Sequence, residues 1–186
     1  TIYIGGGTPS WLNEEWIAAL LEGIFECFNV KEDAEISIEC NPGTLTLNKL
    51  LTYRDAGVNR LSIGLQSTND EELKLLGRIH TYDQFVKNYE MARNVGYKNI
   101  SVDLMYGLPQ QTTEKYLDTV NRIVRLKPDH ISAYSLIVEK GTPFYEKYKF
   151  DMVKQEAGMR TEFLPNEDEL YEMEKAGQAQ LFDAGY

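Results

Sequence analysis

The sequence predicts an α/β fold, a partial (β/α) barrel with about five parallel strands. Short apolar strands alternate with segments that carry helix caps, which is the pattern of βα units. Several strands repeat the order apolar, serine, apolar, variable, as in Ile36–Glu39 and Ile100–Asp103. One face of each such strand is therefore small and polar, whereas the strands of an open doubly wound sheet are apolar on both faces. A polar face favours a barrel whose interior converges at the carboxyl ends of the strands, although β propensity alone also produces such repeats.

Each element has its own signal in the chain. The strands are expected near residues 1–5, 35–40, 60–65, 98–104 and 129–136. Helices are expected to begin at polar cap residues and to end at glycine or before proline. They run from Asn13 to about residue 27, from Thr46 to Gly57, from Asn69 to Gly77, from Thr81 to Gly96, from Thr112 or Thr113 to Pro128, and from Asn166 toward Gly185. Cys27 falls on the apolar side of the first helix and is expected in the core, and Tyr145–Phe150 is expected to be a surface segment.

Composition narrows the class of protein. The net charge is −10 over 186 residues, without a basic cluster, which argues against a nucleic-acid or anionic-membrane partner. No apolar run approaches the ~18 residues of a transmembrane helix. Two cysteines do not make a disulfide framework, so a reducing, cytoplasmic setting is expected. The chain starts within a strand, which indicates a fragment of a longer protein.

Three consecutive glycines follow the first strand, in Gly5-Gly6-Gly7-Thr8-Pro9. Without side chains they let a ligand lie against backbone N–H and C=O groups, and Thr8 adds a hydroxyl. The spacing is neither that of a P-loop nor that of a dinucleotide fingerprint. The same residues also fit a tight βα turn, and the spacing alone does not separate the two interpretations.

Polar residues stand at the ends of the next strands. Glu39 and Asp103 end the second and fourth strands on the interior face, where a carboxylate is costly unless a partner or ligand pairs it. Gln66 ends the third strand on the same face. Arg78, twelve residues later, follows a helix-ending glycine and can clamp a carboxylate, although an arginine in a loop is more often a surface residue. Together these groups suit a polar small molecule that bears an amine, a carboxylate and hydroxyls.

The ordered set of motifs resembles a known family. "GGGTPS", "ECNPG", "LSIGLQS", "LGRIH" and "VDLMYGLPQQT" are similar to motifs of the radical S-adenosylmethionine (SAM) enzymes related to oxygen-independent coproporphyrinogen III oxidase. "ISAYSLIVEKGTPFY" is most similar to the branch of haem chaperones known as HemW. The resemblance runs from Gly5 to about Tyr145 and implies a TIM-like radical SAM domain, of which residues 1–186 would be the central part.

The resemblance also implies roles for individual residues. Gly6, Gly7 and Thr8 match the loop that binds the methionyl moiety of SAM. The remaining contacts to the nucleoside and the amino acid would come from Glu39, Gln66, Arg78 and Asp103.

The resemblance further implies a [4Fe–4S] cluster on a C-x-x-x-C-x-x-C loop, and that loop and a C-terminal domain are expected to lie outside this chain. Cys27 and Cys40 do not match the spacing. Because such a cluster needs thiolate ligands, we expect residues 1–186 alone to hold no cluster, to cleave no SAM and to be inactive.

Two functions remain open for the complete protein, beside a third alternative, a barrel enzyme without radical chemistry whose glycine loop would hold another ligand. One is a haem chaperone that binds haem and passes it to an acceptor protein. The other is a coproporphyrinogen III oxidase that decarboxylates propionates by means of a 5′-deoxyadenosyl radical. Both would use the same SAM-binding residues, and residues that bind a cofactor do not identify the substrate. The amino-acid sequences of Leu108–Thr112 and Ser132–Tyr145 favour the chaperone.

Overall fold

The computed structural model describes residues 1–186 and confirms the α/β class. Its five-stranded sheet has the order β1-β2-β3-β4-β5, and β1 pairs in parallel with β2 and β2 with β3. The strands are β1 (Ile2–Ile4), β2 (Ile36–Cys40), β3 (Arg60–Gln66), β4 (Asn99–Tyr106) and β5 (His130–Ser135). The helices are the 3₁₀ turn η1 (Pro9–Trp11), α1 (Glu14–Cys27), α2 (Leu47–Asp55), α3 (Asp70–Leu75), α4 (Tyr82–Val95), α5 (Thr113–Leu126), α6 (Pro143–Glu156) and α7 (Glu167–Asp183).

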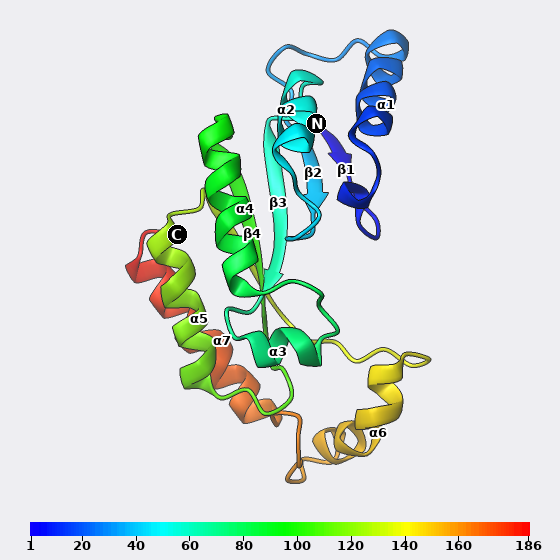
Figure 1. Ribbon diagram of the computed structural model, residues 1–186. Coiled ribbons are helices and arrows are strands. Elements are labelled where there is room, and N and C mark those ends of the chain that lie inside the picture. The colour runs from blue at the N-terminus through cyan, green and yellow to red at the C-terminus, as the bar shows by residue number, and fades with distance from the viewer. The chain divides into compact units, whose positions relative to one another are not determined.

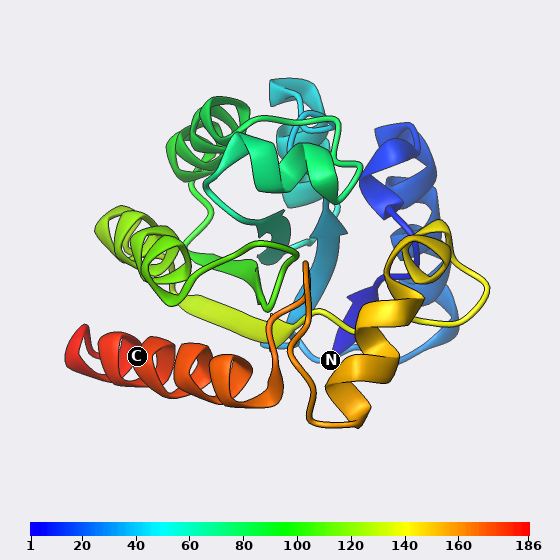
Figure 2. The same ribbon diagram turned by 90° about the horizontal axis from the view of Figure 1, so that it is seen from below.

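The chain divides into two compact units. The first consists of Thr1–Leu65, Gly77–Asp103 and Pro128–Ser132, and the second of Gln66–Leu76, Leu104–Lys127 and Ala133–Tyr186. In the first unit β1, β2 and β3 lie side by side (Figure 1), and α1, α2 and α4 follow one another along one side of them (Figure 2). In the second unit α7 packs along α5 (Figures 1 and 2).

The strands of the first unit have the two faces that the repeat predicts. Their apolar residues are buried and supply the core, among them Ile36, Ile38, Leu61, Ile63, Ile100 and Val102. On the other face Glu39 stands in register with Ser62, and Ser62 donates to Asp103 on β4. The serines of this face, Ser37, Ser62 and Ser101, are buried.

The capping residues set most helix starts as expected. The side chains of Thr46, Asn69, Thr81, Thr112 and Asn166 all accept from the first turn of their helices. Asn13 occupies the cap position of α1 without a side-chain hydrogen bond. Glu72 does not close a capping box with Asn69, because its carboxylate accepts from Ser67 and Gln111 instead.

The expectation that Cys27 lies in the core was wrong. Cys27 is exposed, because the buried stripe of α1 is Ile17 and Leu21. At about 100° per residue, Cys27 lies roughly 120° around the helix from Leu21 and roughly 80° from Ile17. The segment Tyr145–Phe150 lies at or near the surface as expected, with only Tyr148 buried, and Tyr148 packs against the ring of Phe144; the segment forms the middle of α6, which Thr142 caps and Pro143 starts. No helix combines the length and apolar composition that crossing a bilayer requires.

Candidate functional site

The glycine loop after β1 is open on its outer side. Gly6 and Gly7 have φ values of +89° and +68°, and a Cβ at either position would meet no atom within 4 Å. Gly5 differs, since a Cβ there would lie 2.6 Å from the Tyr3 ring and 3.1 Å from the Glu39 carboxyl carbon. The first glycine thus lets Glu39 approach, and the next two leave exposed backbone that a ligand can reach.

Glu39 is held by both of its carboxylate oxygens. Its Oε1 accepts from the Tyr3 hydroxyl at 2.7 Å, and its Oε2 accepts from the Gly6 N–H at 3.1 Å. Partial burial, the hydrogen bond to Glu39 and the charges of Glu39 and Asp103 raise the pKa of Tyr3 to about 12. Tyr3 therefore remains a hydrogen-bond donor throughout the neutral range.

Asp103 lies on the same polar face, two strands from Glu39. Ser62 Oγ, on the strand between them, lies 3.3 Å from each oxygen of Asp103. Burial raises the pKa of Asp103, and the negative charge of Glu39 adds to this effect. Hydrogen bonds from Ser62 and Ser132 and the proximity of His130 act in the opposite direction. Two carboxylates beside small serines form an acidic patch on the strand face, suited to a ligand that brings positive charge or several donors.

The other predicted residues do not all lie beside this acidic patch. Thr8 precedes η1, and its side chain makes no capping hydrogen bond. Arg78 lies in the loop between α3 and α4 and is partly buried. Gln66 belongs to the second unit, where it is 3% exposed and its Oε1 accepts from the Tyr134 hydroxyl at 2.9 Å. The structure therefore brings together Gly6, Glu39 and Asp103.

Sequence reasoning missed the part played by Tyr3. Strand alternation is the signal that could have found it: Tyr3 is in register with Ser37, so its side chain lies on the same face of the sheet as that of Glu39. The three residues of β1 are too few for the alternation to assign Tyr3 to a face from the sequence alone.

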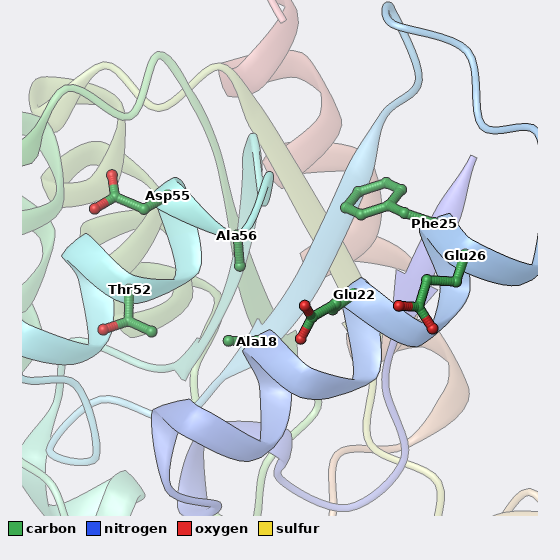
Figure 3. Close-up of a pocket in the computed structure, with 7 residues that line it drawn as sticks. All are labelled: Ala18, Glu22, Phe25, Glu26, Thr52, Asp55 and Ala56. Carbon is green, nitrogen blue, oxygen red and sulfur yellow. The ribbon is translucent and has the colours of Figure 1, made fainter.

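A groove elsewhere in the first unit contains none of the predicted residues. It has a volume of about 710 Å³ and lies between α1 and α2 (Figure 3). It is lined by Ala18, Glu22, Phe25, Glu26, Thr52, Asp55 and Ala56. The carboxylates among these residues have no basic counterpart in the lining, so the groove is unsuited to the anionic end of an amino acid.

Comparison with known proteins identifies the family. The chain matches the profile of the Radical SAM superfamily over residues 1–123. It belongs to this superfamily. Membership implies SAM and a [4Fe–4S] cluster as the cofactors of the complete protein.

Individual radical SAM relatives extend the match along the chain. The "Heme chaperone HemW" of Escherichia coli (strain K12) is 39% identical over 186 residues, which is 100% of this chain and 46% of that protein. The "Heme chaperone HemW" of Bacillus subtilis (strain 168) is 43% identical over 146 residues, or 78% of this chain and 38% of that protein. The solved structure of E. coli coproporphyrinogen III oxidase (HemN) superposes with a TM-score of 0.82 at 31% identity, over 99% of this chain and 40% of that one. The chain thus spans less than half the length of these relatives.

The two implied cofactors fit this chain differently. The open glycine backbone and the acidic patch of Glu39 and Asp103 suit the amine, hydroxyl and sulfonium groups of SAM. A cluster does not fit the residues present, because Cys27 is exposed on α1, Cys40 is buried in β2, and no three His, Cys, Asp or Glu side chains form a metal-binding group.

Proposed function

We propose that the glycine loop and the polar strand face form the SAM site of this radical SAM protein. In this proposal backbone groups of Gly6 and Gly7 and the Thr8 hydroxyl bind the methionyl part. Glu39 and Asp103, with Gln66 and Arg78, bind the remaining polar groups. The observation that carries the proposal is the hydrogen bond between the Gly6 N–H and Glu39, because it joins the two most characteristic motifs at one point. Bound SAM would supply a 5′-deoxyadenosyl group for radical chemistry in the complete protein, and the residues of this chain would hold and orient it.

We further propose that the complete protein is a haem chaperone that binds haem and delivers it to an acceptor protein. The proposal is supported by the match to HemW proteins along the chain at 39% identity. It places the cluster loop and a C-terminal domain in the part of the protein outside residues 1–186. A cytoplasmic setting belongs to the same proposal, since both cysteines are free thiols.

The second candidate is an oxidase that decarboxylates the propionates of coproporphyrinogen III. It is supported by the superposition on HemN at a TM-score of 0.82. The cofactor residues are compatible with both candidates, so the substrate has to be tested directly.

The deciding experiment uses the full-length protein, reconstituted anaerobically with iron and sulfide. SAM, a reductant and coproporphyrinogen III are supplied, and the porphyrinogen products are separated by chromatography. We expect SAM cleavage without a decarboxylated product, followed by stoichiometric binding in a haem titration. A doubly decarboxylated product would refute the chaperone proposal and establish the oxidase.

The SAM site is tested separately by calorimetry on the full-length protein. We expect Glu39→Ala and Asp103→Ala each to weaken SAM binding by about 1–3 kcal/mol, the cost of removing a charged hydrogen-bonding partner. Glu22→Ala is the matched control, because Glu22 is an exposed carboxylate on α1. Unchanged affinity in both site variants would contradict the assignment.

A further inference from the structure

A buried histidine lies between two of the strand ends that carry the proposed site. His80, in the loop before α4, is 3% exposed. Its Nδ1 lies 3.1 Å from Asn41 Oδ1, and its Nε2 lies 3.3 Å from the backbone oxygen of Leu65. Asn41 follows β2 directly, two residues after Glu39, and Leu65 precedes Gln66 at the end of β3.

The imidazole joins these two strands by hydrogen bonds beyond the point where their backbone pairing ends. The last Cα pair of β2 and β3 is Cys40 with Ile63, so Leu65 lies beyond it. A carbonyl oxygen can only accept, so Nε2 carries the hydrogen of the contact to Leu65. The Asn41 amide can present its oxygen or its nitrogen to Nδ1, so the bridge forms with the ring neutral or protonated.

The contact to Leu65 bears on the conformation of Gln66. Gln66 has a φ of +77°, which is unfavourable for a residue with a side chain. This torsion is measured from the carbonyl carbon of Leu65, the group that His80 holds. Unfavourable backbone conformations persist where the surroundings fix them, and they concentrate at ligand sites.

The contact to Asn41 connects the histidine to the loop after β1. The Asn41 N–H donates to Ser10 Oγ at 3.0 Å, and Ser10 Oγ also accepts from the Thr44 hydroxyl at 2.7 Å. Ser10 is fully buried and lies two residues after Thr8 in the chain. One hydrogen-bonded path thus runs from the loop after β1, through the turn after β2, to the end of β3.

We propose that His80 is a positioning residue for SAM, which fixes the turn after Glu39 and the peptide group before Gln66. It acts through these neighbours and does not itself touch the ligand. The inference rests on the proposed function, since it assumes that Glu39 and Gln66 bind SAM. The alternative is a histidine that only stabilises the core.

The test is SAM binding by calorimetry on the full-length, reconstituted protein, with the melting temperature of each variant measured in parallel. His80→Leu removes the polar contacts to Asn41 and Leu65, and we expect it to raise the Kd about tenfold or more. His80→Gln keeps an amide nitrogen near the position of Nε2, so it should restore the Kd to within about threefold of the wild type. Val95→Ala shortens a buried side chain of α4 and serves as the stability control, which should lower the melting temperature and leave the Kd unchanged.

The outcomes separate the two proposals. A wild-type Kd in His80→Leu, together with lost binding in Glu39→Ala, would overturn the positioning role and leave the SAM site standing. Equal losses of affinity in His80→Leu and Val95→Ala would show that His80 only stabilises the core, and would overturn the positioning role. Absence of SAM binding by the wild-type protein would overturn both. If His80→Leu fails to fold, His80→Gln still decides, because a tenfold weaker Kd in that folded variant would contradict the assigned bridge to Leu65.

Discussion

At the scale of single residues, the site depends on how Glu39 is held. A carboxylate on an interior strand face needs partners, and Glu39 has one donor for each oxygen, the Tyr3 hydroxyl and the Gly6 N–H. The donors come from either side of Gly5, so β1 and its loop together orient one side chain. A ligand that binds the glycine loop therefore encounters a carboxylate that is already oriented.

Tyr3→Phe isolates one of these two donors. The ring is retained and only the hydrogen bond to Glu39 is lost, so we expect the Kd for SAM to rise about three- to tenfold in calorimetry, as a hydrogen bond worth about 1 kcal/mol predicts. Tyr171→Phe removes a hydroxyl from an exposed tyrosine of α7 and should leave the Kd unchanged. An unaltered Kd in Tyr3→Phe would mean that the Gly6 N–H orients Glu39 without help.

At the scale of elements, two helical glycines have opposite surroundings. A Cβ at Gly177 in α7 would lie 2.5 Å from the buried ring of Tyr116 in α5, whereas a Cβ at Gly23 in α1 would meet nothing within 4 Å. Alanine favours a helix over glycine by about 1 kcal/mol. At Gly177 this gain is opposed by overpacking against a rigid ring, which typically costs about 1–3 kcal/mol. We therefore expect urea denaturation to show Gly177→Ala destabilised and Gly23→Ala stabilised by about 0.5–1 kcal/mol. Stabilisation by both changes would show that α7 can move away from α5.

The segment after α6 is fixed by a single buried carboxylate. Asp151 is 4% exposed and accepts from the backbone N–H groups of Glu162, Phe163 and Leu164. Burial acts to raise its pKa, but these donors and Lys154 outweigh it and leave the pKa below the ordinary value of 3.8. The carboxylate thus contributes stability above the unfolded pKa and loses it as the pH falls through the lower folded pKa.

Asp151→Asn tests this anchor. The amide keeps one acceptor oxygen for three donors, so we expect a loss of about 1–3 kcal/mol at pH 7 in urea denaturation. The difference from the wild type should shrink as the pH falls below about 4, because the wild-type carboxyl then becomes protonated. Glu156→Gln, at an exposed position of the same helix, is the control. A difference that stays constant down to pH 2 would contradict the assigned charge.

Local signals predicted most of the elements, and long-range contacts explain the exceptions. Thr81 with Gln84 and Asn166 with Glu169 specify their capping boxes within four residues, so the sequence shows them directly. The helix α6 was missed although Thr142 and Pro143 carried a start signal, because aromatic and charged residues alternate along it without an apolar stripe. Its closing anchor, Asp151 to Phe163, joins residues twelve apart that no periodicity relates. The hydrogen bonds of His80 to Asn41 and Leu65 could likewise not be predicted from the sequence, since they join residues far apart in the chain.

At the scale of the whole molecule, net charge is the feature that no single element shows. The chain has 29 acidic and 19 basic residues, and its isoelectric point is about 4.7. Several of its ion pairs join two exposed side chains, such as Lys74 with Glu71 and Lys149 with Glu146. Exposed pairs contribute about 0–1 kcal/mol each, so at neutral pH the repulsion among excess carboxylates is the larger electrostatic effect.

Salt should therefore stabilise the chain at neutral pH. Raising NaCl from about 20 to about 300 mM shortens the screening length from roughly 20 Å to about 6 Å, which weakens repulsion between distant carboxylates more than attraction within contacting pairs. We expect the melting temperature at pH 7.5, measured by circular dichroism, to rise by about 2–4 °C, the shift that corresponds to roughly 1 kcal/mol in a chain of this size. Near pH 5, close to the isoelectric point of about 4.7, the same addition should change it little, because the net charge is then nearly zero. A melting temperature that falls with salt at pH 7.5 would mean that attractive pairs outweigh the repulsion of the excess charge.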